Sequence, residues 1–327
     1  MDSFIPVGKS RFLYYLHKVD TILDNAATSE NPALVAYKED LRTPFFMLEA
    51  LSRLYKKICS HKKFNKLNER FKDIEDALGR IDYYDGFYQQ FLQQKNIPAE
   101  ITDYVKEQRD EKTQDLNDLF KEEKWIGKNK NRVAKIKKNL DQVDWFDEKH
   151  DSQAILDIYQ NDIDKVIKKY KVKKLEFKDV ENDVHELRRR VRWLSIYPQS
   201  LRGLMELKQN AEPPDFLKKY LTPEVLNSPF NVLPDGSGLQ SHILLNNNYF
   251  YALSWLIAEL GKLKDSGLKI LLLEESIDKV YKTKGDVREL AHSISGEDQP
   301  TLDQILSQSQ KIATTFFEEN ILQNLIA

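Results

Sequence analysis

The sequence contains little cysteine, glycine and proline. Its 327 residues include one cysteine, Cys59, together with 11 glycines and 11 prolines. A single cysteine excludes a disulfide within the chain, a zinc site built from several thiolates and an iron–sulfur cluster, and it is typical of a reducing compartment. The low glycine and proline content argues against a turn-rich β protein and favours long helices.

Long apolar runs are also missing. No uninterrupted apolar stretch approaches the roughly 20 residues that span a bilayer as a helix. The first residues lack the apolar core and the small-residue cleavage site of a secretory signal. We therefore expect a chain that does not enter a membrane, and we predict a cytoplasmic location.

Neither sign of charge is in large excess. The 50 lysines and arginines nearly balance 52 aspartates and glutamates, so the formal net charge is -2. This balance argues against non-specific affinity for nucleic acid over the whole surface, although it permits a local basic patch. Apolar residues make up 41% of the chain, which is enough for a folded core. Such a composition predicts a folded protein with many solvated helix faces.

Apolar residues recur at intervals of three and four, which predicts an all-α fold. The expected helices cover residues 9–24, 33–60, 64–95, 98–125, 151–171, 176–209, 240–264, 267–283 and 301–325. The segment 211–238 differs, because it carries five prolines and ends in Asp-Gly-Ser-Gly. We interpret it as an irregular insertion with at most short helices.

Two of the expected helices share a heptad pattern at an offset of 150 residues. The later stripe is Val184, Leu187, Val191, Leu194, Leu201 and Met205, and the earlier one is Leu34, Tyr37, Leu41, Leu48, Leu51, Tyr55 and Ile58. Each helix is followed by a Leu-Gly pair, at 78–79 and at 260–261. These landmarks predict a duplicated helical unit with halves 1–140 and 141–327. Chance remains the alternative, since any two amphipathic helices share a heptad.

The densest chemical signal is a basic face on the later helix. His185, Arg188 and Arg192 follow one another at i, i+3 and i+7, and Arg189 lies beside them. Like charges at this spacing repel, and phosphate groups would relieve the repulsion through paired hydrogen bonds with guanidinium. The alternative is that nearby acids neutralise the face, namely Asp179, Glu181, Asp183 and Glu186. At the same offset the first half has Lys38 and Arg42, with Val35 at the position of the histidine.

Other basic segments are less specific. Lysine-rich runs cover residues 128–138 and 165–174, and neither contains an acidic residue. Runs of this kind are usually solvated helix faces, and lysines lack the planar fork of arginine. We expect these two runs to contribute auxiliary electrostatics.

No catalytic motif is present. The sequence has no glycine-rich phosphate loop, no dinucleotide-binding fingerprint, no His-Glu-x-x-His and no Gly-x-Ser-x-Gly elbow. Its six histidines are scattered, and none has a second histidine at a ligand spacing. We predict a protein that is not an enzyme and needs neither metal nor cofactor. The alternative is a helical enzyme that uses Asp82, Asp85 or His185 as acid or base.

The order of these elements resembles the CHAD domain, a conserved histidine α-helical domain. The resemblance rests on His185 followed by Arg188, Arg189 and Arg192, and then on Leu-Gly at 260–261 with Asp265 four residues after Gly261. The first half matches in outline through Lys38, Arg42 and Leu-Gly at 78–79. It departs at Val35, Phe45 and Phe46, and the second half departs at Ser195. The resemblance implies a duplicated set of four-helix units that binds inorganic polyphosphate through basic residues of both halves.

The resulting functional prediction is non-enzymatic binding of inorganic polyphosphate or a similar polyanion. The predicted binding residues are His185, Arg188, Arg189, Arg192, Lys38 and Arg42. A protein partner is also possible, whereas sequence-specific nucleic acid and membrane partners are not expected. The rival prediction is a helical interaction or scaffold protein that has lost the polyphosphate site. An aromatic stripe at residues 84, 87, 88 and 91 is either core or a docking surface, and His185 faces either the arginines or the core.

Overall fold

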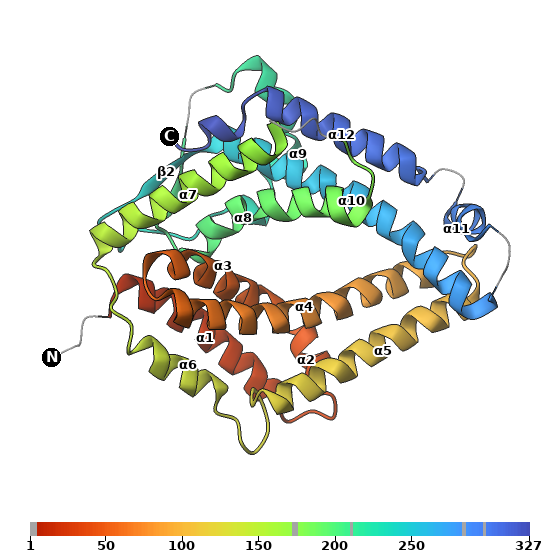
Figure 1. Ribbon diagram of the computed structural model, residues 1–327, viewed down its shortest axis with the longest axis horizontal. Helices are drawn as coiled ribbons and strands as arrows, with labels where there is room; N and C mark the ends of the chain where they lie inside the picture. Colours follow the sequence, from red (N-terminus) through yellow and green to blue (C-terminus); the bar gives the residue numbers. More distant parts are fainter. Residues whose placement is uncertain (1–4, 172–175, 210–211, 283–285, 297–298) are drawn as a thin grey trace. The chain divides into compact units, whose positions relative to one another are not determined.

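A computed structural model describes residues 5–171, 176–209, 212–282, 286–296 and 299–327. Over these residues the chain is mostly helical, which confirms the all-α prediction (Figure 1). It divides into two compact units: unit 1 is Met1–Asp151 with Lys279–Tyr281, and unit 2 is Ser152–Asp278 with Lys282–Ala327. That the two units repeat one architecture stays a prediction.

Unit 1 is built around a long helical hairpin. Its helices are α1 (Val7–Ala26), α2 (Pro32–Lys38), α3 (Arg42–Ile58), α4 (His61–Leu92), α5 (Ala99–Glu122) and α6 (Arg132–Leu140). Helix α3 packs along α4, α4 packs along α5, and α1 packs on α3. Buried aromatic rings fill one end of this core, where Trp145 lies 5.3 Å from Tyr55 and 5.7 Å from Phe64 between ring centroids.

The predicted helix 33–60 is wrong in one respect, because the chain forms two helices there. Asp40 adopts a left-handed conformation with φ 56° between α2 and α3. Pro44 follows in the first turn of α3, where its missing N–H breaks no helical hydrogen bond, whereas in a continuous helix it would remove one. The predicted apolar stripe is nevertheless buried from Leu41 to Tyr55. The heptad therefore identified the core face but not the break.

A buried charge cluster ties the start of α7 (Glu148–Lys171) to the rest of unit 1. Arg11 Nη1 donates to Asp151 Oδ2 at 2.5 Å and to the Tyr55 hydroxyl at 2.6 Å. The Tyr55 hydroxyl in turn donates to Asp151 Oδ1 at 2.8 Å. Both charged side chains are 2% exposed. Unit 1 extends to Asp151 because this carboxylate is bound by α1 and α3.

Unit 2 combines long helices with a small sheet. After α7 come a π-helical turn (Val180–His185), α8 (Glu186–Ser200), β1 (Met205–Lys208), α9 (Pro223–Leu226), β2 (Ile243–Asn246), α10 (Asn247–Tyr281), α11 (Val287–Ser295) and α12 (Leu302–Glu318). Three short 3-10 helices cover Asp215–Tyr220, Pro229–Asn231 and Leu322–Asn324. Strands β1 and β2 pair in parallel, with Met205 opposite Ile243. Buried aromatic rings join the helices, and Tyr170 of α7 stacks on Phe317 of α12 at 5.7 Å.

Three predicted boundaries in unit 2 are wrong. The helix expected over 176–209 ends at Ser200, because Arg202 and Gly203 have φ values of 52° and 91°. A Cβ on Gly203 would lie 2.4 Å from the carbonyl oxygen of Asp235, so only glycine fits this position. The helices expected over 240–264 and 267–283 form the single helix α10. Residues 243–246, which were expected near the start of the first of these helices, form β2 instead. Helix α11 was not expected.

The proline-rich segment of unit 2 contains only short helices within its described residues. Phe230 and Val232 are 76% and 73% exposed, although the carbonyl oxygens of both residues accept hydrogen bonds from Gln199. This segment thus presents apolar side chains on a backbone fixed to α8. In the described part of the chain, no helix is both long and apolar enough to cross a bilayer.

Candidate functional site

The predicted basic face lies along the π-helical turn and α8. Asp179 precedes the turn, and its side chain accepts a hydrogen bond from the backbone N–H of Asn182. Leu187, Val191 and Leu194 are buried at helical spacing, as the heptad predicts. The cationic side chains therefore leave the helix beside its buried stripe. His185 ends the π-helical turn, and Arg188, Arg189 and Arg192 follow on α8.

His185 faces neither the core nor the arginines. Its Nδ1 lies 2.8 Å from Oε2 of Glu181, one turn earlier, and its side chain is 37% exposed. The hydrogen bond from His185 holds the pKa of Glu181 below its ordinary value, although burial acts the other way. The acidic neighbour that the sequence offered as an alternative is thus the partner of this histidine.

The carboxylate of Glu186 forms ion pairs with three cations. Arg189 Nη2 and Arg190 Nε each lie 2.5 Å from its oxygens, and Lys169 Nζ lies at 3.8 Å. Partial burial acts to raise the pKa of Glu186, but hydrogen bonds and charges from Arg189 and Arg190 outweigh it and keep the pKa low. Three cations thus meet at one carboxylate beside the exposed side of α8.

Arg188 and Arg192 sit closer to the core. Arg188 Nε donates to the carbonyl oxygen of Ile257 on α10 at 3.1 Å. Its guanidinium crosses α10 at Gly261, where a Cβ would lie 3.1 Å from Nε. Arg192 is half-buried, and its carbonyl oxygen accepts a hydrogen bond from Ser195. These two arginines are held by the packing of α8, whereas Arg189 extends into solvent.

The first-half residues Lys38 and Arg42 belong to unit 1. Lys38 ends α2 and is exposed. Arg42 begins α3, and two carboxylates bind it: Nε lies 2.8 Å from Glu75 and Nη1 lies 2.6 Å from Asp82. Because each unit is described by itself, the predicted approach of these residues to α8 stays a prediction. Arg42 is already neutralised by acids of its own unit.

The paired carboxylates Asp82 and Asp85 act as structural acceptors. Asp82 pairs with Arg42, and Arg109 Nη1 lies 3.4 Å from Asp85. The Tyr37 hydroxyl donates to both, at 3.4 Å and 3.3 Å. Burial, followed by these two negative charges, raises the pKa of Tyr37. The network joins α2 to α5 across α4, and it contains no isolated carboxyl group suited to acid–base chemistry.

The aromatic stripe on α4 is mostly core. Phe87 and Phe91 are buried, and Tyr84 and Tyr88 are half-buried. Arg109 lies over the Tyr88 ring, 4.9 Å from its centroid. The stripe therefore packs within unit 1 and does not form an open docking surface.

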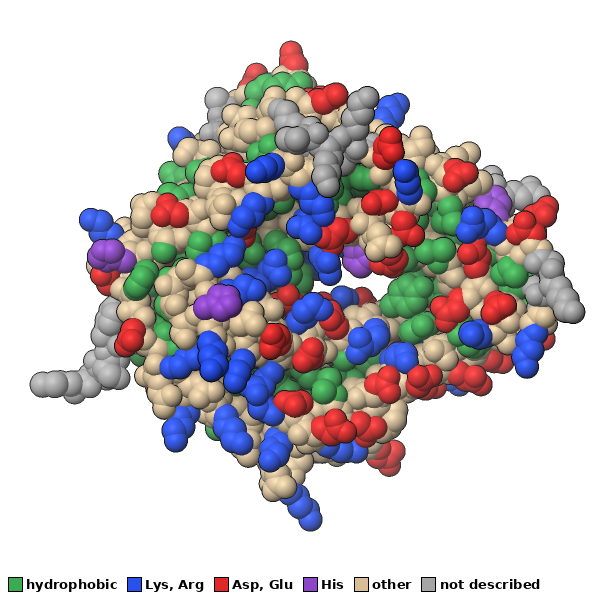
Figure 2. All heavy atoms as spheres, viewed as in Figure 1, with side chains coloured by type: hydrophobic (Ala, Val, Ile, Leu, Met, Phe, Trp, Pro, Cys, Tyr) green, Lys and Arg blue, Asp and Glu red, His purple; other side chains and the backbone are tan. Residues whose placement is uncertain are grey.

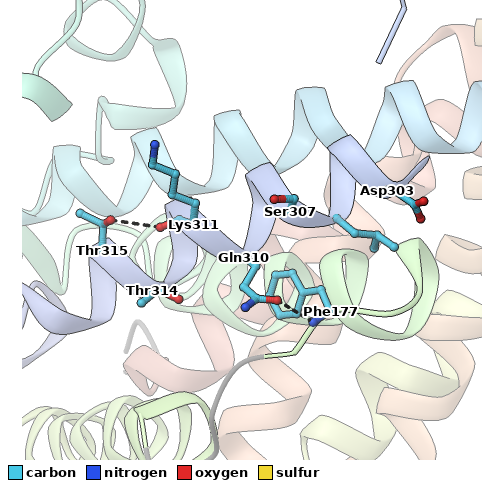
Figure 3. Close-up of a pocket in the computed structure, with 8 residues that line it drawn as sticks. Phe177, Asp303, Ser307, Gln310, Lys311, Thr314 and Thr315 are labelled. Carbon is cyan, nitrogen blue, oxygen red and sulfur yellow. Dashed lines mark hydrogen bonds between the residues drawn. The ribbon is translucent and has the colours of Figure 1, made fainter. Parts of the chain in front are cut away.

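A groove of about 500 Å³ runs along α12 in unit 2 (Figure 3). Its polar lining includes Asp303, Gln310, Lys311 and Thr315, and Gln310 Oε1 accepts a hydrogen bond from the backbone N–H of Phe177. The Thr315 hydroxyl donates to the Lys311 carbonyl oxygen, and no histidine or cysteine lines the described part of the groove. Among the described lining residues, the hydroxyl of Thr315 is thus bound to a backbone carbonyl and not to a side-chain base. Among the described residues, no group of three or more possible metal ligands occurs.

The sequence analysis missed one basic segment. Lysines 56, 57, 62, 63 and 66 occur within eleven residues that contain no acid. The segment spans the end of α3 and the start of α4, so division of the sequence into helices hid its continuity. A count of charge in a sliding window would have found it. Of the two lysine runs that were predicted, Lys173 and Lys174 lie outside the described residues.

Comparison of the chain with family models, with curated proteins and with solved structures finds no match.

Proposed function

We propose that this protein binds inorganic polyphosphate or a similar polyanion without catalysing a reaction. The observation that carries the proposal is the group of cations on α8 and the end of α7, where Arg189, Arg190 and Lys169 share the carboxylate of Glu186. A chain of phosphate groups would add negative charge among them. The resemblance of this helix to the CHAD domain supports the same ligand, and the single cysteine supports a cytoplasmic setting.

The residues differ in the contact that each would make. Arg189 is exposed, so its guanidinium is able to exchange Glu186 for phosphate oxygens in paired hydrogen bonds. Arg188 is anchored on Ile257, and it would contribute a fixed positive charge together with Arg192. His185 lies 2.8 Å from Glu181, so it would have to leave that carboxylate to contact phosphate.

The two residues of unit 1 have unequal weight in this proposal. Lys38 is exposed and available as an auxiliary charge. Arg42 would have to leave Glu75 and Asp82, which lie within 2.8 Å and 2.6 Å of its guanidinium. We therefore assign the principal contacts to α8 and only a secondary contribution to Lys38 and Arg42.

The test is titration of the purified protein with long-chain polyphosphate at low and at physiological salt. Binding is expected to saturate and to weaken steeply with salt, because each phosphate contact releases counterions. Replacement of the exposed pair by Arg189→Gln with Arg190→Gln should weaken binding at least tenfold. The pair Arg188→Ala with Arg192→Ala should weaken it as well, but these side chains pack, so their fold must be checked by circular dichroism.

A matched control removes two charges from another helix of unit 2. Lys218 and Lys219 lie in the 3-10 helix Asp215–Tyr220, away from α8 in sequence, and both are exposed. Lys218→Gln with Lys219→Gln should leave binding within about twofold. Binding that does not depend on salt contradicts the proposal. So does a result in which Lys218→Gln with Lys219→Gln weakens binding as much as Arg189→Gln with Arg190→Gln does.

The rival function is that of a helical interaction protein. The observation that favours it is the exposed apolar surface of Leu226, Phe230 and Val232 in the proline-rich segment. Two results together would support this second function. The protein would not bind polyphosphate at low salt, and the folded protein would bind a hydrophobic dye that Phe230→Ser with Val232→Ser no longer binds.

A further inference from the structure

A compact lysine surface occupies the turn between α3 and α4 in unit 1. We define the α3–α4 lysine surface as Lys56, Lys57, Lys62, Lys63 and Lys66. Lys57, Lys62 and Lys66 are exposed, and Lys56 and Lys63 are half-buried. The surface continues toward α6, because Lys63 Nζ donates to the carbonyl oxygen of Gln142 at 2.7 Å, just beyond that helix. Figure 2 shows lysine and arginine side chains gathered over the side of unit 1 where α6 lies in Figure 1.

This arrangement costs stability within unit 1. Lys62 and Lys66 are four residues apart on α4, and Lys63 and Lys66 are three apart, so each pair brings like charges together. The first turn of α4 also contains no acid, and positive charge near a helix N-terminus opposes the helix dipole. Further along the same helix, Lys72 pairs with Asp76. The middle of α4 thus contains a compensated lysine, whereas its first turn does not.

Two of the five lysines, Lys57 and Lys63, have partners within the protein. Lys56, Lys62 and Lys66 make no ion pair with any residue that the structure describes. Burial, and then the charges of Arg53 and Lys57, lower the pKa of Lys56. On α6, Lys135 and Lys138 are likewise exposed and form no ion pair within the described chain. An external anion would relieve this repulsion.

Apolar side chains emerge beside the same lysines. Trp145 packs on Tyr55 near the end of α3 and on Phe64 near the start of α4. The next residue, Phe146, is an exposed aromatic side chain. Ile5 is also exposed, and it lies just before α1, whose Gly8 packs against the Trp145 ring. One end of unit 1 therefore combines lysines with an aromatic and an aliphatic side chain.

We propose that the α3–α4 lysine surface, with Phe146 and Ile5, binds the surface of an anionic membrane, a partner that the sequence analysis did not predict. Clusters of four to eight lysines or arginines are typical of surfaces that bind anionic lipid headgroups. Aromatic and aliphatic side chains beside them would enter the interfacial layer. Nucleic acid fits less well, because the five residues that define the surface are lysines, which lack the planar fork that arginine offers to a base edge.

Nearby acids limit the attraction without cancelling it. Asp147 flanks Phe146, but its carboxylate accepts hydrogen bonds from the Nδ1 and the backbone N–H of His150. Asp144 is exposed, and Glu69 follows Lys66 by three residues on α4. Five lysines outnumber these three carboxylates, and Lys135 and Lys138 add two positive charges on α6. The proposal concerns unit 1 and is independent of polyphosphate binding at α8.

The experiment is flotation of the full chain with phosphatidylcholine vesicles that contain or lack phosphatidylserine. Binding is expected only with phosphatidylserine, and it should weaken as salt rises from low to physiological concentration. Lys62→Gln with Lys66→Gln should lower the partition coefficient by roughly 25-fold, about fivefold for each charge. Phe146→Ser should lower it further at every salt concentration, because its contribution is apolar.

The matched control is Lys106→Gln with Lys121→Gln. These lysines are exposed on α5 of the same unit and change the net charge equally, so this variant should bind vesicles as the wild type does. The proposal is overturned if Lys106→Gln with Lys121→Gln loses as much vesicle binding as Lys62→Gln with Lys66→Gln does. It is also overturned if the wild type binds equally well to vesicles without phosphatidylserine. Duplex DNA binding that needs Lys62 and Lys66, with no vesicle binding, also overturns it. Arg189→Gln with Arg190→Gln on α8 should bind vesicles as the wild type does. This result would distinguish the lysine surface from the polyphosphate site.

Discussion

Arg188 crosses α10 directly over Gly261, so that a Cβ on this glycine would lie 3.1 Å from the arginine Nε. The same relationship occurs in unit 1, where Arg42 crosses α4 over Gly79 and a Cβ would lie 2.8 Å from Nη2. Each Leu-Gly pair thus has a physical reason, because the missing side chain makes room for an arginine from a helix earlier in the chain. This relation aligns Arg42 with Arg188, whereas the heptads align it with Arg192, one helical turn later.

Gly261→Ala should change the free energy of unfolding by less than about 1 kcal/mol. Alanine is favoured over glycine in a helix by about 1 kcal/mol, and the new Cβ displaces only a flexible arginine by a few tenths of an ångström. The hydrogen bond from Arg188 to Ile257 should weaken, so polyphosphate affinity should fall while stability is kept. Urea unfolding and polyphosphate titration of one preparation measure both effects.

Two other glycines should respond in opposite directions. A Cβ added to Gly86 on α4 would have no neighbouring atom within 4 Å, so Gly86→Ala should stabilise unit 1 by about 1 kcal/mol. On α10, a Cβ at Gly267 would meet both methyl groups of the buried Val180 at 2.9 Å. Gly267→Ala should therefore destabilise unit 2 by about 1–2 kcal/mol, since a branched buried side chain has little room to move. If urea unfolding shows that both substitutions change the free energy of unfolding in the same direction, this explanation is refuted.

The apolar stripe and the helical class were predictable because both depend on local periodicity. Leu187, Val191 and Leu194 are buried as the heptad requires. Contacts between residues far apart in sequence had no local signal: Arg11 binds Asp151 across 140 residues, and Met205 pairs with Ile243 across the proline-rich segment. The break at Asp40 depends on one backbone conformation, which a heptad count does not detect.

Glu49 is expected to make unit 1 less stable as pH rises. Burial is the main cause that raises the pKa of this α3 carboxyl from 4.5 to about 7, Arg53 opposes the rise only in part, and Glu75 adds to it. Below pH 4.5 Glu49 is protonated in both folded and unfolded chains, so it has no effect. Between pH 4.5 and 7 the unfolded chain loses this proton first, and folding stability falls by about 3 kcal/mol.

Glu49→Gln should therefore raise the free energy of unfolding at pH 8 by up to about 3 kcal/mol, with little gain at pH 4. The measurement is urea unfolding across this pH range. Glu107 is exposed on α5, so Glu107→Gln serves as a control that should show no such pH dependence. A constant difference between Glu49→Gln and the wild type at every pH would show that the carboxyl is not the cause.

Asp151→Asn should destabilise unit 1 by about 3–5 kcal/mol. The substitution removes the negative charge that lies 2.5 Å from Nη1 of the buried Arg11, and a buried charge without its counter-charge is costly. Tyr55→Phe removes only a hydroxyl from the same cluster, so it should cost about 1 kcal/mol. Urea unfolding should rank the two variants in this order. A smaller loss for Asp151→Asn would mean that the cluster is held by packing and not by charge.

The candidate site was predictable in its cations but not in their partners. The spacing placed Arg188 and Arg192 on the edge of the core, where the structure finds them half-buried. It offered several acids as possible partners, and only the side-chain conformations show that Glu181 binds His185 while Glu186 binds Arg189. The lysines at the start of α4 were overlooked because they follow a helix boundary.

Glu186→Gln should increase the affinity for polyphosphate. The substitution removes a carboxylate shared by Arg189, Arg190 and Lys169, so the exposed guanidinium of Arg189 no longer has to exchange it for phosphate oxygens. The slope of log affinity against log salt should steepen by about 0.7 if one further phosphate is contacted. Glu289 on α11 is exposed, and Glu289→Gln makes the same change in net charge elsewhere in unit 2. If both variants raise affinity equally, the ligand responds to net charge alone; if Glu186→Gln weakens binding in a folded protein, the basic face of α8 is not the site.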